Sequence, residues 1–384
     1  MKKAIESKCV LLSEHKDRFI GDRMNDKQIT KICIDGFKSI KHCELELNMI
    51  NVLIGSNGAG KSNFISLFKM LQSMIDGELQ LYVAKHGGSN AFLFSGSKKT
   101  EKISIKFYFG ANGYEFDLVP TVGNQFLFEG EWFYWETSGN KLVARGHGES
   151  LWNKGTGTRI DKFVKPILSN QKWRVYHFHD TSDTALVKQM CGINDNQELA
   201  VDARNLAAFL YRLKMKEEGC YRRIVSTVKM VAPFFSDFVL RPDPLNESQI
   251  ILEWKDINSE VPFLGAQLSD GTLRFICLAT LLLQPRELMP ETILIDEPEL
   301  GLHPYAISLL AALIKKASVE KQIIISTQSV ELVNEFSAND IIVVNHHDDH
   351  SEFERLDADK LQTWLEDDYT LGDLWKSNII GGRP

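Results

Sequence analysis

The chain has 384 residues and a formal net charge of −7 at pH 7, and this length allows two or three compact units. Its 43% hydrophobic and 25% charged residues are typical of globular proteins and exclude general disorder. The acidic balance excludes binding to nucleic acid through overall charge alone, although local basic patches stay open. No run approaches the ~18 consecutive apolar residues of a membrane helix, and the cysteines lack metal or redox spacing. We therefore expect a soluble cytoplasmic protein without a membrane partner.

The first part of the chain predicts an extension followed by strands and a helix. Residues 1–28 are mixed in charge and weakly periodic, so we expect them to lie outside the main fold. Apolar residues then alternate with their neighbours at Ile32 and Ile34, which is typical of half-buried strands. The apolar run 52–54 predicts a buried strand, and an apolar stripe over residues 63–74 predicts a helix soon after it.

The remainder changes from a β-rich to a helical and then to an alternating pattern. Residues 90–180 carry aromatic strand-like runs punctuated by Gly, Asn and Ser, as hairpins require. Residues 198–231 return to helical spacing, and strands alternate with helices from a strand at 250–254 onward. No heptad run is long enough for an extended coiled coil. The sequence therefore predicts an α/β fold with a compact β-rich insertion and a helical lid, not a long arm.

A glycine-rich segment lies between the predicted buried strand and the predicted helix. It fits the pattern G-x-x-x-x-G-K-[ST] in full, in which small residues let backbone N–H groups converge on phosphate oxygens. Lys61 can reach the β- and γ-phosphates, and the Ser62 hydroxyl can ligate Mg²⁺. The predicted nucleotide-binding residues here are Gly55, Ser56, Asn57, Gly58, Ala59, Gly60, Lys61, Ser62 and Asn63.

Two acidic residues follow another buried strand. The apolar run 292–295 ends in Asp296 and Glu297, and ligands gather at the carboxyl ends of parallel strands. We expect Asp296 to hold Mg²⁺ and Glu297 to orient and deprotonate an attacking water. Gln328 follows the predicted strand 322–325. It can sense a γ-phosphate by hydrogen bonding, or it can be a loop amide bonded to nearby backbone.

Two further segments could bind anions: the start of a predicted helix and a stretch of basic residues. Ser269 is placed as the N-cap of an apolar helix over 273–283, and this helix start with Ser269 and Gly271 can bind an anion or simply be capped. Residues 204–229 carry seven basic side chains against two acidic ones. They predict either a phosphate-contacting surface or an ordinary solvated helix face.

Together these segments resemble the ABC-type ATPases of the RecF/SMC class. The resemblance rests on the Walker A loop, the Leu-Ser-Asp-Gly signature at 268–271, the Walker B strand with Glu297, and the segment 299–303. The segments 204–213 and 372–384 are similar to a narrower group of stand-alone bacterial predicted AAA/ABC ATPases. The resemblance covers the chain from about Lys31 onward.

The resemblance implies a homodimer that holds ATP and Mg²⁺ between two heads. Ser269 and Gly271 would then contact the γ-phosphate of the partner's site. Gln328 stands where the class has a switch histidine, and a glutamine carries no titrating proton, so switching through it would not depend on pH. Residues 177–180 are a weak match to the class's Q-loop. Residues implied to act within their own chain are Lys61, Ser62, Asp296 and Glu297.

The resemblance also implies the domain plan and the function. The parts expected are an N-terminal extension (1–28), ATPase lobe I with the β-rich insertion (29–180), the helical lid and signature lobe (181–290), and the Walker B, switch and remaining core segment (291–384). The implied function is Mg²⁺-dependent ATP hydrolysis coupled to head–head dimerisation, in DNA repair or anti-phage defence. A regulatory ATP switch for a separate effector protein, without DNA binding, stays open. A transporter ATPase subunit is a minor alternative, and ATP over GTP follows from the class alone.

Overall fold

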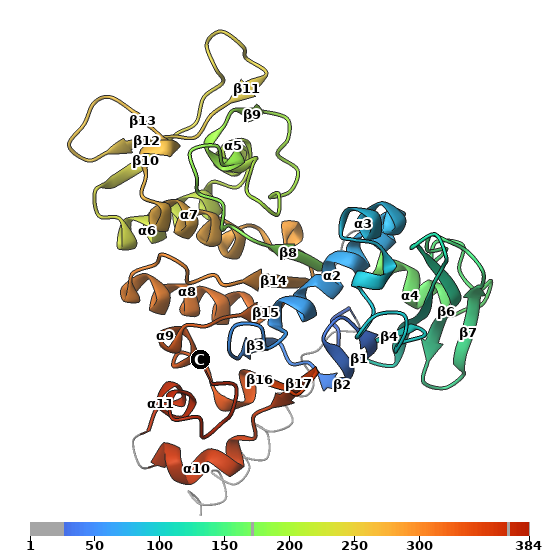
Figure 1. Ribbon diagram of the computed structural model, residues 1–384. Helices are drawn as coiled ribbons and strands as arrows, with labels where there is room; N and C mark the ends of the chain where they lie inside the picture. Colours follow the sequence, from blue (N-terminus) through green and yellow to red (C-terminus); the bar gives the residue numbers. More distant parts are fainter. Residues whose placement is uncertain (1–26, 170–172, 367–368, 384) are drawn as a thin grey trace, which may run out of the picture.

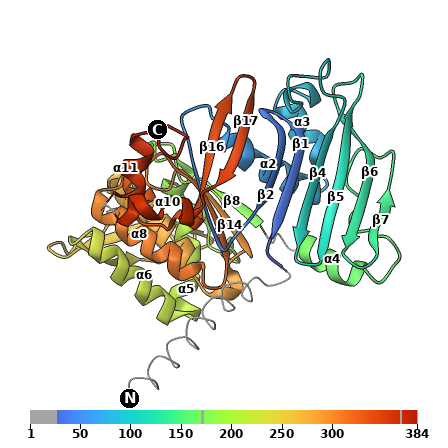
Figure 2. The same ribbon diagram turned by 90° about the horizontal axis from the view of Figure 1, so that it is seen from below.

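The computed structural model describes residues 27–169, 173–366 and 369–383. Residues 1–26, most of the predicted N-terminal extension, lie outside this description. Two six-stranded sheets dominate the fold, and they lie side by side with one long helix between them (Figure 2). Helices cover the other face of one of these sheets, so the predicted α/β class is confirmed (Figure 1).

The first sheet is mixed. Its strand order is β17 (His350–Arg355), β16 (Ile341–His347), β3 (Ile50–Ile54), β15 (Gln322–Ser326), β14 (Thr292–Asp296) and β8 (Trp173–Tyr176). Every neighbouring pair from β16 to β8 is parallel, and β17 pairs with β16 in the antiparallel sense. The strands predicted from the apolar runs at 52–54, 292–295 and 322–325 are therefore confirmed.

The second sheet is antiparallel and forms the predicted β-rich insertion together with the first strands of the chain. Its order is β2 (Ile40–Glu46), β1 (Lys31–Phe37), β4 (Ile103–Phe109), β5 (Asn112–Pro120), β6 (Phe126–Trp135) and β7 (Gly139–Ala144). Many of its aromatic side chains are fully buried, among them Phe107, Phe116 and Phe128. They fill the layer between this sheet and helix α2 (Lys61–Ile75), where Phe68 meets Phe107 edge to face.

The central strands serve two hydrophobic cores at once. Ile293 and Ile295 face the core shared with the helical lobe, whereas Leu294 faces the core shared with α2 and the second sheet. Ile325 and Ile324 divide in the same way on β15. Successive side chains of a strand point to opposite faces, so continuous apolar runs are what a sheet covered on both faces needs.

The helical lobe covers the other face. Helix α7 (Asp270–Leu283) packs against α8 (Pro304–Ala317) and against α6 (Glu218–Val231), which follows α5 (Leu206–Lys216). The strand expected at 250–254 is divided, because β11 ends at Ile250 and pairs with β9, whereas β12 begins at Glu253 and pairs with β10 and β13. These short strands are β9 (Cys191–Gly192), β10 (Phe235–Val239), β11 (Gln249–Ile250), β12 (Glu253–Asp256) and β13 (Phe263–Leu264).

Shorter helices complete the described chain. They are α3 (Leu79–Lys85), α4 (Asp161–Leu168), α9 (Val330–Val333), α10 (Ala358–Glu366) and α11 (Leu371–Lys376). Single 3₁₀ turns are η1 (Ser89–Ala91), η2 (Leu186–Lys188), η3 (Gly265–Gln267), η4 (Arg286–Leu288) and η5 (Ala338–Asp340). None of the helices in the described ranges has both the length and the apolar character that crossing a membrane requires.

Candidate functional site

Parallel strands bring the predicted site residues to one edge of the mixed sheet. Register pairs Asp296 with Ser326, and Ser326 with Leu53, so β14, β15 and β3 end side by side. The chain continues from these ends into Glu297, Gln328 and the loop that starts at Gly55. Residues far apart in the sequence therefore meet at this edge, where ligands of open α/β sheets gather.

The glycine-rich loop between β3 and α2 is held in shape by its own lysine. Lys61 is 5% exposed, and its ammonium group donates to the carbonyl oxygens of Gly55 at 2.5 Å and Ser56 at 3.1 Å. Burial lowers the pKa of Lys61, while the nearby carboxylates of Glu297 and Asp296 raise it. The loop backbone is thus held in a fixed shape by the ammonium group of Lys61, which bonds to its first two carbonyl oxygens.

The end of this loop rests on residues that the sequence patterns did not single out. Gly60 has φ +120°, and a Cβ atom there would lie 2.1 Å from the Ser351 hydroxyl oxygen of β17. The Ser351 hydroxyl donates to that of Ser39 at 2.7 Å, and Asn63 donates to the same Ser39 oxygen at 2.7 Å. Glycine is required at position 60 because the Ser39–Ser351 pair occupies the space of a side chain. Ser62, in the first turn of α2, is exposed.

The two acids after β14 have separate partners. Ser326 donates its hydroxyl hydrogen to the Asp296 carboxylate. Glu297 has φ +41°, an uncommon backbone conformation for a residue with a side chain. Its N–H donates to the Ser326 carbonyl at 2.8 Å, and its carboxylate accepts from the Gln328 side-chain amide at 2.5 Å. Glu297 and Gln328, which the sequence predicted separately, are therefore in direct contact.

Glu299 is a buried carboxylate that our sequence predictions did not include among the site residues. It is 8% exposed, and one oxygen accepts from the Thr327 hydroxyl at 2.6 Å and from the Gln328 N–H at 3.1 Å. Its other oxygen has no hydrogen-bond partner among the described residues. Burial raises the pKa of Glu299, and the nearby Glu297 adds to this effect. Glu299 fixes the backbone that carries Gln328.

Arg274 connects the signature helix to the same edge, and this role was also missed. It lies on α7, is 8% exposed, and donates to the carbonyls of Phe178 at 2.9 Å, His179 at 3.1 Å and Leu300. The His179 ring in turn contacts the Asp296 carbonyl through Nε2 at 2.8 Å. The segment 177–180, a weak sequence match to a Q-loop, thus lies beside the Asp296 end of β14.

The predicted signature residues stand at the start of α7. Ser269 is exposed, and its hydroxyl oxygen caps the helix by accepting from the Thr272 N–H at 3.2 Å, which confirms the predicted N-cap. Gly271 lies against the segment after β14, because a Cβ atom there would be 2.3 Å from the Gly301 carbonyl oxygen. Packing within the chain therefore also explains why position 271 is a glycine.

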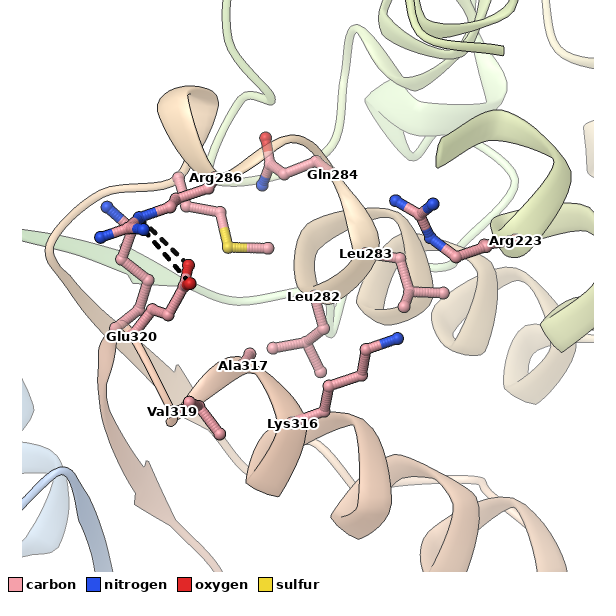
Figure 3. Close-up of a pocket in the computed structure, with 11 residues that line it drawn as sticks. Arg223, Leu282, Leu283, Gln284, Arg286, Lys316, Ala317, Val319 and Glu320 are labelled. Atoms are coloured by element: carbon pink, nitrogen blue, oxygen red, sulfur yellow. Dashed lines mark hydrogen bonds and ion pairs between the residues drawn. The ribbon is translucent and has the colours of Figure 1, made fainter. Parts of the chain in front are cut away.

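A cavity of about 480 Å³ lies elsewhere, where α7 and α8 end (Figure 3). Leu282 and Lys316 line it, and Arg286 pairs with Glu320 at its rim. It also includes Lys321, which directly precedes β15. The cavity is thus at the amino ends of the strands, opposite the glycine-rich loop.

Comparison with models of protein families shows to which family the chain belongs. Residues 50–334 match the family described as "AAA domain, putative AbiEii toxin, Type IV TA system". The chain belongs to this family. A search among curated proteins finds no significant match.

Solved structures show the same fold. A structure of the Smc head bound to the C-winged helix domain of ScpA is 18% identical, with a TM-score of 0.60, and the match covers 87% of this chain and 99% of that one. A Pyrococcus furiosus Smc head with an extended coiled coil is 16% identical, with a TM-score of 0.52 over 88% and 98% of the two chains. A Pyrococcus yayanosii Smc head is 13% identical, with a TM-score of 0.51 over 88% and 99%. The chain therefore has the fold of the Smc ATPase heads, as its resemblance to the RecF/SMC class predicted, and an AAA domain by family.

Replacing Arg274 should destabilise the fold. Arg274→Met has similar volume but no donor, so it leaves the three carbonyls without this partner, and we expect a loss of about 2–4 kcal/mol in the free energy of unfolding. Urea unfolding measures this. The exposed Arg204 provides the control: Arg204→Met should change stability by less than about 0.5 kcal/mol. Equal losses in both variants would contradict the assigned role.

Glu299→Gln should change how stability depends on pH. Because the pKa of Glu299 is raised in the folded state, the folded protein binds more protons than the unfolded chain, and its stability falls as pH rises through the folded-state pKa. The variant keeps an acceptor oxygen but lacks this fall. The stability of the variant relative to the wild type should therefore grow from about pH 4 upward, as measured by urea unfolding at several pH values. Exposed Glu136 is the control, and an equal trend in Glu136→Gln would disprove this assignment.

Proposed function

We propose that the chain binds ATP with Mg²⁺ and hydrolyses it at a site completed by a second copy. The observation that carries the proposal is the contact between Gln328 and Glu297 at the sheet edge that also bears the Lys61 loop. A phosphate-binding loop, a water-activating carboxylate and an amide that can report the γ-phosphate are the parts that phosphoryl transfer to water requires. The AAA-domain family of the chain supports the same function.

Binding rests on the loop and on α2. The backbone N–H groups of residues 55–60 and the start of α2 would bind the phosphates, and Lys61 would exchange its loop carbonyls for β- and γ-phosphate oxygens. The exposed Ser62 hydroxyl and the Asp296 carboxylate offer the oxygen donors that Mg²⁺ prefers. When bound there, Mg²⁺ would neutralise phosphate charge.

Hydrolysis rests on Glu297. Its carboxylate would take the proton of the attacking water, while Gln328, held through its N–H by Glu299, sets the position of that carboxylate. A bound γ-phosphate would compete with Glu297 for the Gln328 amide. The contact therefore offers a direct link between the presence of the γ-phosphate and the orientation of the base.

The partner copy would contribute its signature helix. Ser269 is exposed at the start of the 14-residue helix α7, where the positive end of the helix dipole favours an anion. Placing this end on the partner's γ-phosphate would make ATP part of a homodimer interface. Hydrolysis and loss of phosphate would then weaken the dimer, an ordinary population shift.

Lys61→Ala and Glu297→Gln should separate binding from hydrolysis. Lys61→Ala removes the loop cation and should abolish ATP binding in calorimetric titration. Glu297→Gln keeps the binding groups and should bind ATP while its turnover falls by about 10²–10⁴-fold. Glu297→Gln should also dimerise with ATP and Mg²⁺ in light scattering, and Ser269→Arg should prevent this dimer. Near wild-type turnover of Glu297→Gln would show that another group activates the water.

Two outputs of the cycle are expected, and the contacts of the basic segment 204–229 bear on the choice between them. Several basic side chains between residues 204 and 229 already have partners within the chain: Arg212 donates to the carbonyls of Asn196 and Gln197, Arg222 pairs with Glu218, and Lys214 lies over the Tyr221 ring. These contacts occupy donor groups that could otherwise bind DNA phosphates, and Glu218 offsets the charge of Arg222. The family description names a toxin–antitoxin system, and the Smc head structure includes a partner protein, ScpA. A regulatory ATPase acting on a separate effector protein is therefore the second candidate, beside a role on DNA in repair or anti-phage defence.

A pull-down distinguishes these outputs. Tagged Glu297→Gln, trapped with ATP and Mg²⁺ in its native cells, should recover one defined protein and no nucleic acid if the effector function is correct. Recovery of DNA instead would support a nucleotide-gated clamp. The double variant with Lys61→Ala is the control, because either partner must be lost when ATP is not bound.

A further inference from the structure

The segment after α11 lies directly on the first residue of the phosphate loop. A Cβ atom on Gly382 would lie 3.4 Å from Gly55 Cα and 2.7 Å from a methyl group of Val343, and Gly382 has φ +60°. Gly55 is buried, and a Cβ atom on it would lie 2.4 Å from the Val344 carbonyl oxygen. The start of the loop is therefore confined by β16 and by Gly382.

Two side chains fix the backbone of Gly382. Its N–H donates to the Asn345 side-chain oxygen at 2.6 Å, and its carbonyl accepts from the indole N–H of Trp375. Trp375 is fully buried. Side chains thus bind both the N–H and the carbonyl of Gly382, although this residue lies outside any helix or strand. Its backbone position is therefore fixed by Asn345 and Trp375.

Helix α11 is itself anchored beside the Gln328 segment. The Gly372 N–H donates to the Asn334 side chain at 2.6 Å, and a Cβ atom on Gly372 would lie 2.4 Å from a Val330 methyl group. Val330 begins α9, two residues after Gln328. Residues 371–383 therefore span from the segment after β15 to the segment after β3.

We propose that residues 371–383 form a phosphate-loop bracket, in which Trp375 and Gly382 are positioning residues for nucleotide binding. This inference rests on the proposed function. Gly55, the residue against whose Cα Gly382 lies, also accepts from Lys61 through its carbonyl oxygen, so the bracket supports both the start of the loop and the residue that holds its cation. N–H groups converge on a phosphate only if the loop backbone is preorganised. Loosening the Gly382 end of the bracket therefore weakens binding, whereas the α11 end, which lies near Gln328, keeps its contacts.

Trp375→Phe tests the bracket with little loss of volume. It removes the donor to Gly382, so the Kd for ATP should rise by up to about tenfold, the limit set by the free energy of one buried hydrogen bond. The KM should rise by a similar factor, while kcat at saturating ATP should stay within about twofold of the wild type. Trp254→Phe is the matched control, because the buried indole of Trp254 likewise donates to a backbone carbonyl, that of Leu264 at 3.1 Å, within the helical lobe. Its Kd should match the wild type.

A second variant keeps the test valid if Trp375→Phe does not fold. Gly382→Ala places a methyl group against Val343 and Gly55, whereas Gly139→Ala has a similar positive φ with no atom within 4 Å. Only Gly382→Ala should weaken ATP binding. Unchanged affinity in Trp375→Phe or Gly382→Ala, or an equal loss in the controls, overturns the bracket. Absence of ATP binding by the wild type would instead refute the proposed function itself.

Discussion

The in-register parallel pairing of β3, β15 and β14 is the constraint on which the rest of the molecule depends. Parallel strands about 4.8 Å apart deliver their following residues to one edge, where Gly55, Glu297 and Gln328 meet. A shift of one residue in any of these strands would exchange its two buried faces and move its last residue away from the others. The packing of both hydrophobic cores therefore enforces the geometry of the site.

Around this edge, a few buried polar groups hold backbone segments in place. Glu299 holds the segment that carries Gln328, and Arg274 holds the segments that follow β8 and β14. Burying a charged group costs free energy unless the group has hydrogen-bond partners. An apolar side chain would fill the same space without this cost, so packing alone does not explain Glu299 or Arg274. Each instead replaces several weak contacts with directed bonds to main-chain atoms. The α7 helix, which bears Ser269, is joined through Arg274 to the chain beside Asp296.

Much of the fold was predictable from local patterns, because continuous apolar runs mark strands covered on both faces and glycines with Lys61 mark the phosphate loop. The contact of Glu297 with Gln328 could also be predicted once both residues were assigned to the ends of parallel strands. Other features were not. Ser351 lies 312 residues from Ser39, and Arg274 lies 96 residues from Phe178. Nothing near these residues in the sequence signals such partners, and the division of 250–254 between two small sheets depends on pairing that a single segment does not encode.

The two-faced central strands also bear on how the chain is made. The core that holds α2 and the aromatic sheet includes Leu294, Ile324 and Val344, all of which leave the ribosome long after the residues they cover. At a synthesis rate of about 5–20 residues per second, the aromatic sheet and α2 wait for several seconds to tens of seconds with one side open to solvent. The core beneath α2 and the glycine-rich loop therefore stays incomplete until β14, β15 and β16 have been translated. The order of translation thus places the closing of this core, and with it the final support of the loop, after the synthesis of β16.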